Sequence, residues 1–160
     1  LMLPSQSGKN EIIEVNVEKK SKLEKLKNKA TQGSSKAAFT LGTIYLNGLN
    51  KTKVDKKEAF NWFKKSAKEG NNKAQYNLGL YYERGEFVKQ DSLKAIHWFK
   101  KSANQNNSKA QYNLAVMYAN GSGIQKDLTK TKYWTKKAIN NNFEKAQQLW
   151  SIFELENIKG

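Results

Sequence analysis

The sequence predicts an all-α protein, an α-solenoid of about three helix-turn-helix repeats with a capping helix at each end. The thirteen residues from Lys73 to Gly85 (KAQYNLGLYYERG) return nearly unchanged 36 positions later, from Lys109, and in a weaker form 37 positions earlier, from Lys36. An aromatic-rich stretch follows each copy, and its tryptophans are spaced by 36 residues: Trp62, Trp98 and Trp134. Repetition with a period of 36–37 residues is typical of stacked two-helix units.

The repeats define the expected domain organisation. We expect a tail at residues 1–17 and a single domain at 18–160, with repeats at about 34–70, 71–106 and 107–142 and a C-terminal capping helix at 143–158. The tail carries the only proline, Pro4, and a short alternating stretch, IIEVNV. We therefore expect the tail to be partly extended and to dock on the first helix.

An N-terminal capping helix is predicted from Glu18 to Gln32. Leu23, Leu26 and Ala30 follow i, i+3 and i+7 and form one apolar stripe of this helix. Gly33 is expected to end it. Shifted by 37 residues, these positions match those of a second helix in a full repeat, so this helix is a degraded half-repeat.

The first helix of each unit carries small and apolar residues at helical spacing. In the middle copy, Ala74, Leu78 and Tyr82 fall on one face and are expected to pack. The matching residues in the other copies are Ala37, Leu41, Tyr45, Ala110, Leu114 and Tyr118. Glycine inside a helix costs about 1 kcal/mol relative to alanine, so we infer that Gly79 allows a partner helix to approach closely. Gly85 is expected to end the helix in the left-handed conformation.

Capping residues are predicted at the start of each helix. The second helices are expected to begin at Asp55, Asp91 and Asp127, whose carboxylates can accept hydrogen bonds from free backbone amides. Three pairs have the spacing of a capping box: Asp55 with Glu58, Asn72 with Gln75, and Ser108 with Gln111.

The second helix of each unit carries an aromatic stripe. Ala95, Trp98, Phe99 and Ala103 follow i, i+3, i+4 and i+8, so we expect the indole and phenyl rings to fill the gap between units. An aromatic stripe at this spacing is typical of a core, and not of a cofactor site.

The charge of the chain leaves two interpretations open. The formal net charge is +15 with a pI near 9.8, which favours an anionic partner. However, Arg84 is the only arginine among 29 basic residues, and arginine is the residue best suited to reading phosphates. A composition bias towards lysine on solvated helix faces explains the charge more simply, and binding of nucleic acid is therefore not favoured.

The residues offer little for catalysis, so we predict a protein that is not an enzyme and holds no cofactor. The chain has no cysteine, which excludes disulfides and thiolate metal sites. The single histidine, His97, has no carboxylate or cysteine at a ligand spacing and is expected to be solvated. The glycines form no phosphate-binding loop. No apolar run approaches the roughly 20 residues that would span a bilayer.

The segment from Lys36 to about Trp150 resembles the Sel-one-like repeat (SLR) family, relatives of tetratricopeptide repeats. The resemblance rests on residues that recur at three registers, shown here for the middle copy: Ala74, Leu78, Gly79, Tyr82, Gly85, Asp91, Ala95, Trp98 and Ala103. The third copy departs from the pattern, with Ala115 for the glycine, Thr131 for the alanine and Thr135 for the phenylalanine, which leaves tight packing of that unit open.

The resemblance implies a scaffold or adaptor that binds a protein or peptide through its repeat surface. It also leaves open an immunity protein that inhibits a bacterial secreted toxin, and the charge leaves open a binder of nucleic acid or anionic surfaces. The resemblance further implies a bacterial envelope or secreted location if an N-terminal signal was removed, and otherwise a cytoplasmic one.

A binding surface follows from the first-helix residues that are not needed for packing. The residues beside the core stripe should point to the concave wall of the solenoid, and we call them the candidate groove: Lys36, Phe39, Thr43, Lys73, Tyr76, Leu80, Lys109, Tyr112 and Val116. Three lysines and three rings in one groove suit a partner segment with acidic and apolar side chains. The alternative is that the rings pack between helices.

Overall fold

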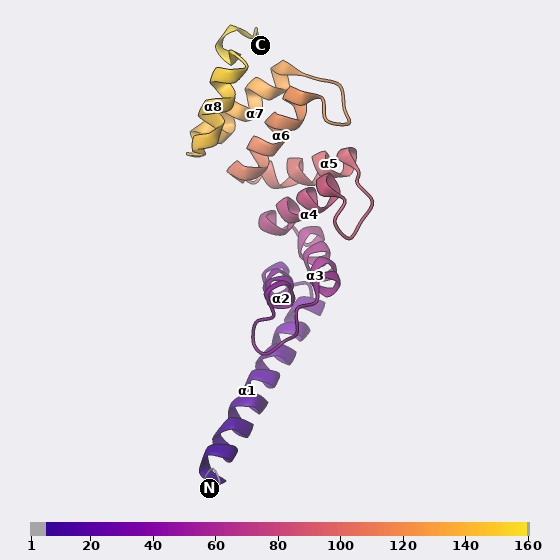
Figure 1. Cartoon of the computed structure of the whole chain (residues 1–160), viewed down its shortest axis with the longest axis vertical. Coiled ribbons are helices and arrows are strands. Elements are labelled where there is room, and N and C mark those ends of the chain that lie inside the picture. Colours follow the sequence, from indigo (N-terminus) through magenta and orange to yellow (C-terminus); the bar gives the residue numbers. More distant parts are fainter. Residues whose placement is uncertain (1–5, 160) are drawn as a thin grey trace, which may run out of the picture.

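The computed structural model describes residues 6–159, which are all-helical, without a strand in that range (Figure 1). The elements are α1 (Gln6–Thr31), α2 (Ser35–Asn47), α3 (Lys56–Lys68), α4 (Asn72–Arg84), α5 (Ser92–Ala103), α6 (Ser108–Asn120), α7 (Leu128–Asn140), α8 (Glu144–Ile152) and the 3-10 helix η1 (Leu155–Asn157). Figure 1 shows them stacked along one axis, with the described N- and C-terminal ends at opposite ends of the molecule. The prediction of an all-α solenoid with capping helices is confirmed.

Three helix pairs form the body of the solenoid. α2 packs on α3, α4 on α5 and α6 on α7, and the second helix of each pair packs on the first helix of the next. α1 packs on α2 through the predicted stripe of Leu23, Leu26 and Ala30, and α8 closes the other end against α7. Each helix therefore buries its apolar face mainly against its neighbours in the sequence, as expected for a repeat protein, and α6 also contacts α8.

The N-terminal segment differs from the prediction. α1 begins at Gln6, so the described part of the expected tail, residues 6–17, is helical and continues the first helix instead of docking on it; Pro4 lies outside the described residues. Once the C-terminal half of α1 is packed on α2, each added residue gains a backbone hydrogen bond without a new nucleation step. The alternating stretch IIEVNV thus extends the helix into solvent.

The aspartate caps are confirmed, and the caps of α4 and α6 are corrected. Asp55, Asp91 and Asp127 each accept a hydrogen bond of 2.9 Å from the backbone amide three residues later. α4 and α6 are capped by Asn71 and Asn107, one residue before the predicted Asn72 and Ser108.

In the two predicted capping pairs that contain a glutamine, the glutamine side chain is buried. The side-chain amides of Gln75 and Gln111 donate to the carbonyls of Ala67 and Ala103, at 3.1 and 3.0 Å, and tie each first helix to the end of the preceding helix. The Asp55 and Glu58 pair is only half formed, because the amide of Asp55 donates to the Tyr45 carbonyl.

The core positions of the first helices are shifted from those predicted. The alanine and leucine of each copy are buried as expected, but in α2 and α4 the next buried residues are Ile44 and Tyr81, and not Tyr45 and Tyr82, which are half-buried. In α6 both Met117 and Tyr118 are buried. On an α-helix, a residue seven positions after another lies at nearly the same angle around the helix axis, whereas a residue eight positions after it is rotated away. The core face therefore continues from Ala37 to Ile44 and from Ala74 to Tyr81.

The aromatic stripe of the second helices is divided between core and surface. Phe63 and Phe99 are 1% and 0% exposed and fill the gap between the helices of a pair. Trp98 was expected to fill the gap between units together with Phe99, but it is half-buried, with the Lys101 ammonium 5.0 Å from its ring centroid. In the first two units the phenylalanine is therefore buried and the indole half-buried, whereas in the third unit, where Thr135 replaces the phenylalanine, Trp134 is itself buried.

The C-terminal capping helix is shorter than the predicted 143–158. α8 ends at Ile152, and the chain turns at Glu154, where φ is +47°, before η1. This turn carries Leu155 into a fully buried position. A helix continued to Ile158 would lack that turn, and burial of the leucine side chain accounts for the break.

Candidate interaction surface

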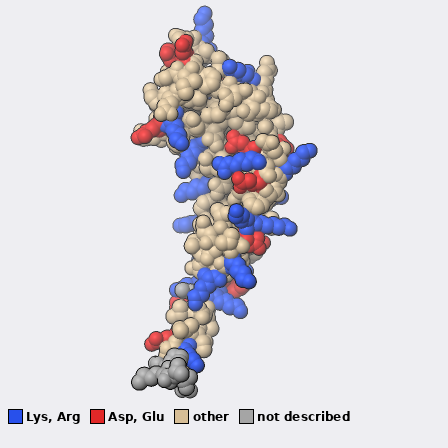
Figure 2. Space-filling view, in the orientation of Figure 1, with Lys and Arg blue, Asp and Glu red and all other residues tan. Residues whose placement is uncertain are grey.

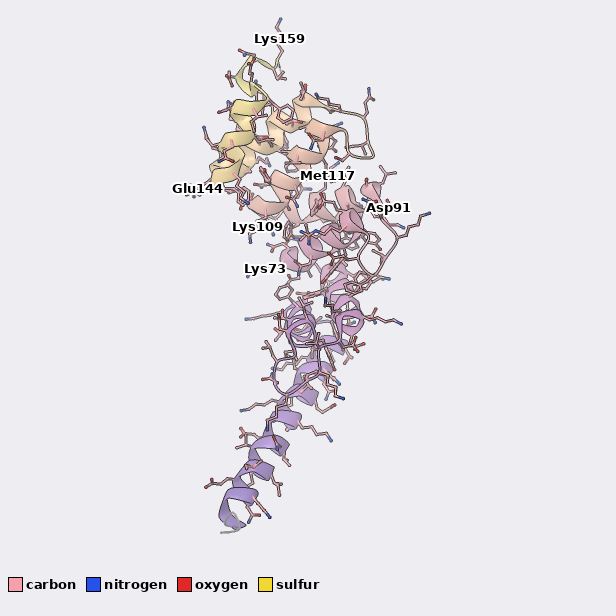
Figure 3. The ribbon with its side chains drawn as sticks, in the orientation of Figure 1. Lys73, Asp91, Lys109, Met117, Glu144 and Lys159 are labelled. Carbon is pink, nitrogen blue, oxygen red and sulfur yellow. The ribbon has the colours of Figure 1, made fainter. Side chains whose placement is uncertain are left out.

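The candidate groove is built by the first helix of each pair. Lys36, Lys73 and Lys109 lie in the first turn of α2, α4 and α6 and are exposed. Figure 3 shows Lys73 and Lys109 on the same side of the molecule and Asp91, the cap of α5, on the opposite side. The stacking of the pairs thus brings Lys73 and Lys109 to one side, and the equivalent position in α2 is Lys36.

The three rings of the candidate groove pack between helices while remaining partly exposed. The ring centroid of Phe39 lies 5.4 Å from that of Phe63, that of Tyr76 lies 5.8 Å from that of Phe99, and that of Tyr112 lies 5.1 Å from that of Phe143. The packing between helices that the sequence left open as an alternative is therefore present, and a role of these partly exposed rings in binding stays a prediction.

A hollow joins candidate-groove residues from three successive units. Its volume is roughly 500 Å³. The lining residues are Phe39, Lys73, Tyr76, Asn77, Asn106, Asn107, Ser108 and Lys109. Four of the nine predicted residues thus come together. The other five, Lys36, Thr43, Leu80, Tyr112 and Val116, do not line it, and Leu80 faces a neighbouring hollow instead.

The electrostatics of the hollow centre on Tyr76. Burial raises the pKa of the Tyr76 hydroxyl, with a smaller lowering effect from Arg84, so the hydroxyl is neutral at physiological pH and can donate a hydrogen bond. Burial also raises the pKa of the nearby Glu83, against the opposing effect of Arg84. Glu83 stands where the other copies have Leu46 and Ala119, so an acid at this position is particular to the middle unit.

Two features of this surface were missed by the sequence analysis. Asn77, Asn106 and Asn107 supply amide groups to the hollow, and the asparagine-rich loop before α6 was the available signal. Phe87 is 47% exposed with φ at +61°, a conformation that strains a bulky residue. The ring centroid of Phe87 lies 5.6 Å from that of Tyr81. The equivalent position one unit later is Gly123, whose φ is +69°.

Clusters of metal-binding side chains and long apolar helices are both absent from the described residues. No group of three or more potential metal ligands occurs among residues 6–159. None of the helices in that part of the chain is long and apolar enough to span a membrane. His97 is exposed and lies edge-to-face with Trp98 at 5.3 Å, in agreement with the predicted solvated position.

The basic charge does not gather into one patch on the face shown in Figure 2. Lysine and arginine side chains are scattered over the length of this view, with carboxylates among them. This distribution agrees with the interpretation that lysine solvates helix faces. Binding of anionic surfaces and the immunity hypothesis both stay predictions.

The stacked helix pairs define a helical repeat protein. A family model of the Sel1 repeat matches residues 35–71, 72–107 and 108–150, and the chain belongs to this family. Sel1 repeat proteins are generally scaffolds for protein–protein interaction, and their fold is of a non-enzymatic type. The predicted membership of the SLR family is confirmed.

Solved structures agree with this assignment. A Sel1 repeat protein from Oxalobacter formigenes is 34% identical, with a TM-score of 0.74 over 79% of this chain and 95% of the other. A protective antigen of uropathogenic Escherichia coli that displays an SLR fold is 40% identical, with a TM-score of 0.72 over 79% of this chain and 27% of the antigen. Cysteine-rich protein B of Helicobacter pylori, 24% identical with a TM-score of 0.61 over 79% of this chain and 96% of the other, shares the fold. A search of curated proteins gives no match.

Proposed function

We propose that this protein is an interaction scaffold that binds a protein or peptide segment through the candidate groove. The observation that carries the proposal is the hollow in which residues of three units meet: Phe39 from α2, Lys73 and Tyr76 from α4, and Lys109 from α6. A site assembled from several repeats recognises a segment longer than one repeat could hold, as is common in solenoids.

The chemistry of the hollow selects the partner. Lys73 and Lys109 are exposed cations that attract carboxylates, and the exposed edges of Phe39 and Tyr76 offer apolar contact. Rings of this kind are preferred anchors in protein interfaces because they bury much area and lose little side-chain entropy. The preferred ligand is therefore a segment with acidic and apolar side chains on one face.

The experiment is a selection of displayed 15-residue random peptides on the whole chain. Selected peptides should be rich in Asp, Glu and large apolar residues. They should bind Lys73→Glu with Lys109→Glu at least about tenfold more weakly than the wild type, which corresponds to about 1.4 kcal/mol. The matched control is Lys64→Glu with Lys100→Glu, which reverses two exposed lysines of the second helices and should bind as the wild type does.

The lysine variants are preferable to variants of the rings. The contacts of Tyr76 with Phe99 and of Tyr112 with Phe143 mean that Tyr76→Ala with Tyr112→Ala would disturb folding as well as binding. Selected peptides that bind the Lys73 and Lys109 variant as tightly as the wild type would contradict the proposal.

A further inference from the structure

The N-terminal half of α1 is an exposed surface that the body of the solenoid does not use. Ile13 and Val17 are 59% and 64% exposed and, one turn apart, form an apolar row along the helix. Figure 1 shows this end of α1 projecting beyond α2. Exposed β-branched residues in succession on a free helix are unusual on a monomer surface and indicate a contact site.

A short segment of the same helix carries the charge opposite to that of the chain, although α1 as a whole has more lysines than glutamates. Residues 10–18 (NEIIEVNVE) contain three glutamates and no lysine, in a chain of net charge +15. Glu14 and Glu18, again one turn apart, form an acidic row directly beside the row of Ile13 and Val17. Glu18 has an ion pair with Lys22 at 2.9 Å, but both side chains are exposed, so this pair contributes little.

Another side of this helix faces the loop between α2 and α3. Glu11, Ile12 and Val15 line a small hollow together with Lys51 of that loop, and the Lys51 ammonium donates to the side-chain carbonyl of Asn16. Ile12 and Val15 nevertheless remain exposed, and the rows of Ile13 with Val17 and of Glu14 with Glu18 lie away from this contact.

These two rows match the two rows of the candidate groove. The groove has lysines in one row, Lys36, Lys73 and Lys109, and partly exposed rings in the next, Phe39, Tyr76 and Tyr112. The nine residues 10–18 extend about 14 Å at 1.5 Å per residue, a length suited to a surface formed by more than one unit. Glu83, the carboxyl near Tyr76, is half-buried beside Arg84 and does not cancel the lysine row.

We propose that the N-terminal half of α1 in one molecule docks in the candidate groove of a second copy. Glu14 and Glu18 pair with the lysine row, and Ile13 and Val17 lie on the rings. The proposal rests on the groove being a binding site, as argued above, and names its occupant. Because the donor helix and the acceptor groove are different surfaces, the contact is head-to-tail and each molecule retains a free helix and a free groove unless the assembly closes.

The test is sedimentation velocity of the whole chain over a range of concentrations, from about 5 to 500 μM at about 50 mM salt, where electrostatic attraction acts over long distances. The wild type should associate as concentration rises. Glu14→Lys with Glu18→Lys (the helix variant) and Lys73→Glu with Lys109→Glu (the groove variant) should each associate at least about tenfold more weakly. The control Lys64→Glu with Lys100→Glu should associate as the wild type does.

A mixture of the two variants supplies the decisive result. The lysine-bearing helix of the helix variant complements the glutamate-bearing groove of the groove variant, so an equimolar mixture should regain association that neither shows alone. A wild type that stays monomeric at 500 μM, or a mixture that remains dissociated, overturns the proposal. If peptides selected on the groove still depend on Lys73 and Lys109 in that case, the groove function stands and only its occupation by α1 is rejected.

Discussion

Gly79 lies directly against the phenyl ring of Phe99: a Cβ atom on Gly79 would stand 2.4 Å from Cδ1 of that ring. Gly42 has the same relationship to Phe63, at 2.6 Å. In the third unit the equivalent residues are Ala115 and Thr135, both fully buried, so a larger first-helix residue faces a smaller second-helix residue. The departures noted in the third copy therefore compensate each other in volume, in agreement with the full burial of Ala115 and Thr135.

We predict that Gly79→Ala is destabilising in the wild type and not in a Phe99→Thr background. In the wild type the added methyl group overpacks the ring contact, at a cost of about 1–3 kcal/mol. With threonine opposite, as in the third unit, the methyl group fits and the helix gains up to about 1 kcal/mol from the better propensity of alanine. A double-mutant cycle by urea denaturation measures the difference. Equal effects in both backgrounds would contradict the paired packing.

We predict that truncating Phe99 costs more stability than truncating Trp98. Phe99→Ala empties a fully buried site and should cost about 3–5 kcal/mol. Trp98→Ala, at a half-buried site, should cost about 1–2 kcal/mol, less than the regular spacing of the three tryptophans indicated from the sequence. His97→Ala is the matched surface control and should stay within about 0.5 kcal/mol. Denaturant midpoints would rank the three, and a larger loss for Trp98 would reverse the assignment.

We predict that Val15→Pro shortens α1 without destabilising the solenoid. Proline removes a backbone hydrogen bond and breaks a helix interior, but residues 8–18 of α1 are outside the packed core. Circular dichroism should show loss of about ten helical residues, while the main melting transition moves by less than about 2 °C. The control Leu41→Pro, in the core of α2, should abolish the transition. Unchanged helicity in Val15→Pro would restore the extended-tail interpretation.

We predict an acid-sensitive contribution from the helix caps. Hydrogen bonds from the backbone amides of Lys94 and Lys130 hold the pKa of Asp91 and Asp127 below the ordinary value of 3.8. Because the folded pKa is lowered, their stabilisation is complete above about pH 4 and is lost as the pH falls through the lowered values. Asp91→Asn with Asp127→Asn keeps the capping oxygen and removes the titration, so its stability should fall less between about pH 4 and 2.

Carboxyl chemical shifts followed by NMR would check this directly. Both caps should titrate below the pKa of an aspartate in an unstructured peptide. Folded-state pKa values at or above 3.8 for Asp91 and Asp127 would exclude this contribution.

The sequence by itself determined the repeat and the local signals that define it. The period of 36–37 residues is read directly from the sequence. The aspartates that begin each second helix and the glycines that end each first helix depend on interactions within a few residues of the chain. The alanine and leucine stripe also follows from helical spacing alone. The period and these local rules therefore sufficed for the fold class, the helix pairs and the buried alanine and leucine positions of the first helices.

The tertiary structure decided what depends on the angles between packed helices. Sequence spacing places Trp98 and Phe99 on one face, and only packing against α4 assigns the gap to Phe99 beside Gly79. It also brings Phe39, Lys73 and Lys109 to one hollow, although they come from three units, since their distance depends on the rotation between successive pairs. Likewise, α1 extends through residues 6–17 because packing of its C-terminal half on α2 supplies the nucleus that the isolated segment lacks.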